Sequence, residues 1–96
     1  MTHVEIHLMP ALDLDTFSTV DQALPTDRPD GLLARYVGPS DWGLAVVVVW
    51  ASQAQADRFG DVLGPVVERL GPPDGANGTH VAFEAVDVIV AADATP

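Results

Sequence analysis

The chain has 96 residues, of which 48% are hydrophobic and none is cysteine, and its 14 acidic side chains against four arginines give a formal net charge of −10. This balance argues against nucleic acid and anionic membranes as partners, because both need clustered positive charge, and the missing cysteines exclude disulfides and thiolate chemistry. The length predicts one domain over 1–96, and without a signal peptide or a long apolar run we expect a cytoplasmic protein.

The first part of the chain predicts a strand followed by a short helix. Residues 3–9 alternate between polar and apolar side chains, which is typical of a strand, and Pro10 ends it. Asp13 or Asp15 is expected to cap a helix that ends near Leu24.

The stretch 43–52 organises the rest of the fold. It contains four consecutive valines, which favour extended backbone, and it lacks the polar alternation of a strand with one wet face. Both of its faces need cover, so we expect it at the centre of a sheet. A strand over 32–37 precedes it, and the turn residues of 38–43 join the two as a hairpin.

The second half predicts a helix and a last strand. Ser52 and Gln55 match a capping box at the start of the helix, and Pro65 inside it predicts a kink or a short break. The last strand is expected over 79–90, with a bulge near residues 85–86, and 91–96 form a loose tail. The helix should bury one apolar stripe, formed by Phe59, Val62, Leu63, Val66, Val67 and Leu70.

The order β-α-β-β-α-β predicts an α+β fold of the ferredoxin-like type, a four-stranded antiparallel sheet with both helices on one face. Helices pack closely over small residues, so the alanine-bearing side of 43–52 is assigned to the helices. Val46, Val48 and Trp50 would then face away from them. A face this apolar needs cover, and a second copy of the sheet is the simplest one, which predicts a homodimer.

Several segments together resemble the dimeric α+β barrel superfamily, which includes antibiotic biosynthesis monooxygenases and is common in high-GC bacteria. The segments are Gly-Leu-Leu-Ala-Arg-Tyr-Val-Gly-Pro at 31–39, Val-Trp-Ala-Ser at 49–52, Arg-Phe at 58–59 and Leu-Gly-Pro at 63–65. The resemblance covers roughly residues 3–90. It implies pairing of sheet to sheet and a pocket between each sheet and its own helices, or within the barrel.

The resemblance implies no single reaction, because the superfamily includes cofactor-independent oxygenases, haem-degrading oxygenases and isomerases. Many relatives carry a histidine where this chain has Arg35, and an acid where it has Val48. The haem-degrading members use a histidine of the second helix, and residues 53–70 contain none. Haem is therefore not expected.

A metal is not predicted either. His3, Glu5 and His7 share one face of a strand, but the two histidines are about 13 Å apart along it, too far to share an ion without leaning steeply. A pair could share an ion if His80 joined it. The preferred interpretation is a polar lining of the dimer cleft.

A second interpretation is acid–base chemistry without a cofactor. His7 would act as the base, Glu5 would orient it, and Arg35 would stabilise a developing oxyanion. Tyr36 points to the opposite face from Arg35, so at most one of them can join His7. Trp50 and Val48 would contact a substrate. Trp42, in the hairpin loop, would be either a lid or, preferably, an anchor at the subunit contact.

Two functions follow from these patterns. The first is a homodimer that acts as a cofactor-independent monooxygenase on a small aromatic or polyketide-like molecule, or binds such a molecule. The alternative is a non-catalytic dimer, either ligand-binding or purely structural, whose polar cleft holds the fold together.

Overall fold

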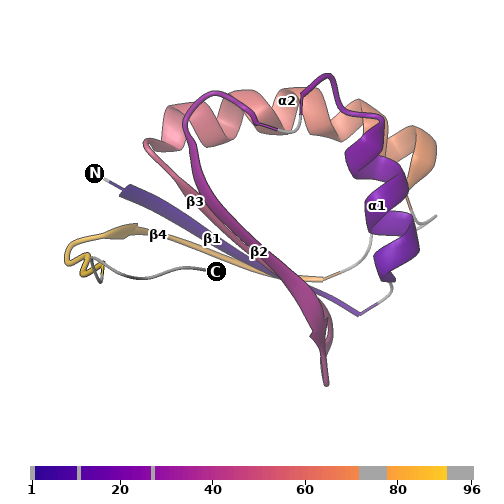
Figure 1. Ribbon diagram of the computed structural model, residues 1–96, viewed down its shortest axis with the longest axis horizontal. Coiled ribbons are helices and arrows are strands. Elements are labelled where there is room, and N and C mark those ends of the chain that lie inside the picture. The colour runs from indigo at the N-terminus through magenta and orange to yellow at the C-terminus, as the bar shows by residue number, and fades with distance from the viewer. Residues whose placement is uncertain (1, 11, 27, 72–77, 91–96) are drawn as a thin grey trace.

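The computed structural model describes residues 2–10, 12–26, 28–71 and 78–90. Its four strands form one antiparallel sheet in the order β2-β3-β1-β4, with both helices on the same side (Figure 1). This is the predicted ferredoxin-like α+β arrangement, and the valine-rich strand is central as expected. In chain order the elements are β1 (Thr2–Met9), α1 (Leu14–Gln22), β2 (Leu32–Ser40), β3 (Gly43–Trp50), α2 (Gln53–Leu70) and β4 (Thr79–Ala85).

Both helices begin at side-chain caps. The backbone N–H of Thr16 donates to Asp13 Oδ1 at 2.7 Å, and that of Gln55 donates to Ser52 Oγ at 3.2 Å. Only half of the predicted capping box forms, because the Gln55 side chain accepts from the Ser52 hydroxyl and donates to Asp30 instead.

The predicted break at Pro65 is wrong, since α2 runs without interruption from Gln53 to Leu70. Pro65 and Asp61 are both exposed, so water can reach the Asp61 carbonyl that loses its helical partner. Val62, expected in the buried stripe, is 42% exposed because it lies at the margin of that stripe. Ala56 and Val66 are the buried residues of α2.

Strand β2 runs beyond its predicted end at Val37, and β4 stops short of its own. Pro39 pairs opposite Leu44, which an edge strand tolerates because the missing N–H can face away from the sheet. Ala85 already lies opposite Thr2, the first residue of β1, so β4 has no partner for the predicted extension to residue 90 or for the bulge within it. The predicted tail at 91–96 lies outside the described residues.

The side of β3 that meets the helices is the opposite of the predicted one. Trp50 is only 2% exposed, and its ring packs against Phe59 of α2 with 5.4 Å between ring centroids. Val46 and Val48, which share its face, point the same way. The prediction assumed that the helices pack closely over the alanine-bearing side of the strand. Instead a cavity separates the helices from the strands, and the larger side chains of β3 point into that space.

The other side of the sheet carries no helix in Figure 1. Three of its large side chains, Tyr36, Val81 and Phe83, are between 46% and 63% exposed. Every charged residue of the described strands lies on the helix side instead. The strand register places these apolar residues on the open face: Val4, Ile6, Leu8, Ala34, Tyr36, Ala45, Val47, Val49, Val81 and Phe83. Within the described part of the chain, neither helix is long and apolar enough to cross a membrane.

Candidate functional site

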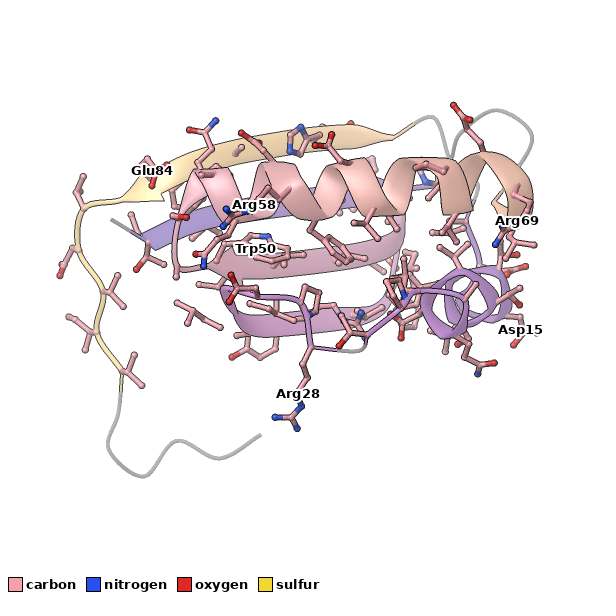
Figure 2. All side chains as sticks on the ribbon, turned by 90° about the horizontal axis from the view of Figure 1, so that it is seen from above. Asp15, Arg28, Trp50, Arg58, Arg69 and Glu84 are labelled. Carbon is pink, nitrogen blue, oxygen red and sulfur yellow. The ribbon has the colours of Figure 1, made fainter. Side chains whose placement is uncertain are left out.

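A cavity of about 580 Å³ lies between the sheet and the two helices. Its apolar walls come from β3, from Phe17 of α1 and from Phe59 and Leu63 of α2. Figure 2, viewed from the helix side, shows Trp50 on β3 beside α2, with α1 seen almost end-on next to the right-hand ends of the strands. The helices therefore roof a recess whose floor is the inner face of the sheet.

Five of the six predicted site residues line this cavity. They come from three neighbouring strands, and the antiparallel register brings them to one face: Glu5 and His7 on β1, Val48 and Trp50 on β3, and Arg35 on β2. Trp42 does not line it. That side chain is 75% exposed in the turn between β2 and β3.

A chain of polar contacts crosses the sheet next to the cavity. Glu84 Oε1 lies 3.1 Å from His3 Nδ1, and His3 Nε2 lies 3.0 Å from Glu5 Oε2. The other oxygen of Glu5 lies 3.3 Å from His7 Nε2. The His7 ring in turn stacks on His80, with 4.6 Å between ring centroids and 15° between planes. Alternation along β1 puts its three members on one face, and β4 supplies the two ends.

His3 is the buried member of this chain, with 4% of its surface exposed. Burial disfavours the charged ring, but hydrogen bonds to Glu5 and Glu84 and the charges of both carboxylates outweigh it, so the pKa of His3 lies above 6.5. Both ring nitrogens face carboxylate oxygens, and only the protonated ring can donate to both. His3 therefore holds Glu5 in place as a charged donor.

His7 can present a basic nitrogen to the cavity. If its Nε2 carries the proton and donates it to Glu5, Nδ1 keeps a free lone pair. The predicted pairing of His7 with Glu5 is thus present in the geometry. Glu5 is shared between two histidines, so it orients both rings at once.

Arg35 is already paired. Its guanidinium donates to both carboxylate oxygens of Asp21, at 2.8 and 3.3 Å, and lies 5.3 Å from the centroid of the Phe17 ring. A ligand anion would have to share Arg35 with Asp21 or displace it. The described cavity lining carries one guanidinium and four carboxylates, those of Glu5, Asp21, Asp57 and Asp61. Its polar groups are therefore mainly acidic.

Two contributors were not assigned to the site from the sequence. From the sequence, His80 enters only as a residue that could complete an ion-sharing pair; it is exposed, yet it also lines the cavity and stacks on His7. The signal was available in the predicted topology, because the last strand is the neighbour of the first, but the register was not. Asp21 was a helix residue without any motif, and only the packing of α1 over β2 brings it to Arg35.

The sequence matches no protein-family model, and a search of curated proteins also finds no match. The fold and the geometry of the cavity therefore carry the functional argument.

Proposed function

We propose that this protein binds a small, largely apolar molecule, of aromatic or polyketide-like character, in the cavity between its sheet and helices. The observation that carries the proposal is the cavity of about 580 Å³ with aromatic side chains in its wall. This volume lies in the range of roughly 300–1,000 Å³ that is typical of small-molecule sites. A few polar groups gathered on the strands would fix the ligand's orientation.

The indole of Trp50 adds support. Its Nε1 is buried and has no hydrogen-bond acceptor among the described residues. Leaving such a donor unpaired costs about 1–3 kcal/mol. Trp50 lines the cavity, so a ligand that displaces the side chains shielding Nε1 would satisfy this group with an acceptor of its own.

The more specific form of this proposal is a cofactor-independent monooxygenase. Such an activity would agree with the proposed membership of the dimeric α+β barrel superfamily. It is favoured by the contact of His7 with Glu5 beside an apolar recess. His7 would accept a proton from a phenol or enol, and the resulting anion would itself reduce dioxygen. Arg35 would stabilise the anion after its ion pair with Asp21 breaks and a new one forms with the ligand. The alternative, a non-catalytic binding or structural dimer, requires only that the cavity or the polar chain supports the fold.

The assembly that we propose is a homodimer packed through the open faces of two sheets. Ten apolar positions gather there, and each side chain that a partner covers contributes roughly 1.5–3 kcal/mol. The distribution of charge permits a second copy to dock through this face. The chain carries −10, so two copies repel through most surfaces, and the charge-free strand face allows close approach. Val86 and Ile89, which follow β4, are 92% and 88% exposed and extend the apolar surface.

Ligand binding is tested by thermal unfolding with a panel of hydroxylated naphthalenes and anthracenes. A ligand at 100 times its Kd should stabilise the protein by about 2.7 kcal/mol. The matched variants are Val48→Phe, which puts a ring into the cavity, and Val47→Leu, a conservative change on the opposite face. Loss of the shift in Val48→Phe alone supports the site. Unchanged unfolding across the whole panel would contradict the binding proposal.

Catalysis is tested separately from binding. Oxygen consumption with each stabilising ligand should fall strongly in His7→Ala while the thermal shift persists. A shift without any oxygen uptake in the parent protein favours the non-catalytic alternative. Sedimentation of the parent protein tests the assembly, and a monomeric mass at micromolar concentration would contradict the homodimer.

A further inference from the structure

Glu5, His7 and His80 converge on one point of the cavity wall, and one ligand atom of each lies within 4.8 Å of the others. We propose that these three side chains bind a divalent transition-metal ion, with Zn²⁺ and Fe²⁺ as the best-matched ions. Two imidazoles and one carboxylate are a donor set that both ions favour. The inference rests on this cluster alone and does not depend on the proposed ligand.

The strand register builds the cluster. His80 lies directly opposite His7 in the β1–β4 pair, so the two rings stand side by side on the helix-facing surface. Glu5 lies two residues before His7 on the same face of β1. His3 is too far from His7 along β1 to share an ion with it. His80, on the neighbouring strand β4, takes that place in the cluster.

The distances suit one ion. Glu5 Oε1 and His7 Nε2 are 3.3 Å apart. Neighbouring ligands around a tetrahedral ion with bonds of 2.0–2.1 Å are roughly 3.4 Å apart. The His80 ring is stacked on that of His7, with 4.6 Å between centroids and 15° between planes, so it has to tilt out of the stack to point its nitrogen at the same centre.

Two side chains outside the proposed ligand set hold the Glu5 carboxylate in position. His3 contacts the second oxygen of Glu5 at 3.0 Å and is itself held by Glu84 at 3.1 Å. Such contacts from outside the ligand set orient a ligand and typically change metal affinity by 10–100-fold. Three protein ligands also leave at least one position of the ion open, and these residues line the cavity, so that position can face a bound molecule.

Metal binding and base catalysis make different demands on His7. An ion uses the lone pair of Nε2, whereas in the metal-free protein this nitrogen donates its proton to Glu5. The His7-dependent oxygen reaction proposed above therefore belongs to the metal-free protein. Metal binding can be measured without any ligand, so failure of one proposal leaves the other intact.

The test is a titration of the metal-free protein with Co²⁺, followed by visible absorption, together with equilibrium dialysis against Zn²⁺ and elemental analysis. We expect one ion per chain and a cobalt spectrum distinct from that of the aqueous ion. Circular dichroism confirms that each variant is folded.

Two variants test the proposed ligands, and a third serves as the control. His80→Ala removes an exposed side chain and Glu5→Gln preserves shape, so both should stay folded while affinity falls at least about 100-fold, beyond the usual range for supporting residues. Glu68→Gln makes the same chemical change on the exposed surface of α2 and should bind as the parent does. An aqueous-ion spectrum in the parent protein, or equal affinity in all three variants, would overturn the proposal.

Discussion

The two faces of the sheet have the reverse of the usual distribution in a soluble domain. The face beneath the helices carries the charged strand residues and the histidines and surrounds a cavity, whereas the face without helices is largely apolar across all four strands. Core formation alone would place the apolar face inward. This inverted arrangement is the basis of two proposals, a ligand site on the inner face and a second copy covering the outer face.

The largest expected effect comes from removing the aromatic anchor of the inner face. Trp50→Ala should lower the free energy of unfolding by about 3–5 kcal/mol, because the ring is buried against Phe59. Urea unfolding measures it. The exposed Trp42 provides the control, since Trp42→Ala should change monomer stability by no more than about 0.5 kcal/mol. A weaker dimer in that control would support the predicted anchor role of Trp42.

A charge placed on the outer face should break the assembly. Val47→Asp is expected to weaken the dimer by at least roughly 100-fold, or about 2.8 kcal/mol, because two carboxylates would be buried near the two-fold axis. Analytical ultracentrifugation over a concentration series gives the dissociation constant. Arg58→Asp, an exposed change on α2 that also adds negative charge, is the control. Equal weakening by both would indicate general repulsion rather than this face.

The polar chain of the inner face should stabilise the fold in a pH-dependent way. His3→Gln is expected to cost about 1.5–3 kcal/mol at low pH, the usual value of charged hydrogen bonds. The folded pKa of His3 is raised, so its contribution is complete below the unfolded value of 6.5 and is lost as pH rises through the folded pKa. Denaturant unfolding of both metal-free proteins should show the gap closing above pH 6.5. A constant gap would show that His3 acts through packing alone.

The smallest effect is expected at the rim of the cavity. Arg35→Gln removes a partly exposed ion pair with Asp21 and should cost only about 0.2–1 kcal/mol. Its effect on a bound phenolate should be larger than its effect on folding. Isothermal titration with ionised and neutral forms of one ligand would separate the two, and equal losses for both forms would remove Arg35 from anion recognition.

Sequence patterns were sufficient for the fold because its signals are local. The alternation along β1, the valine run of β3 and the caps at Asp13 and Ser52 each act within a few residues. The facing of β3 was predicted wrongly because alanine and valine positions alternate without a polar marker, and residue size alone did not decide between the faces. Only packing distinguishes them, through the contact of Trp50 with Phe59.

Most residues of the candidate site could be predicted from the sequence, but the side chains that they contact could not. His7, Glu5 and Arg35 were predicted from residue type and strand alternation on a face expected to point away from the helices, whereas they line the cavity beneath the helices. Whether Arg35 is free or paired depends on how α1 crosses β2, which no motif encodes. His80 required the register of two strands that are more than seventy residues apart in the chain. Contacts of this kind are set by the whole fold rather than by local sequence.

The central position of β1 has a consequence for the order of events during synthesis. One neighbour of this strand, β4, follows it more than sixty residues later in the chain, so β1 keeps an unpaired edge until β4 has been translated. Pairing over such a long separation is slow, and an exposed central strand invites association with other chains. Until β4 is added, this edge should therefore depend on a chaperone for protection from other chains.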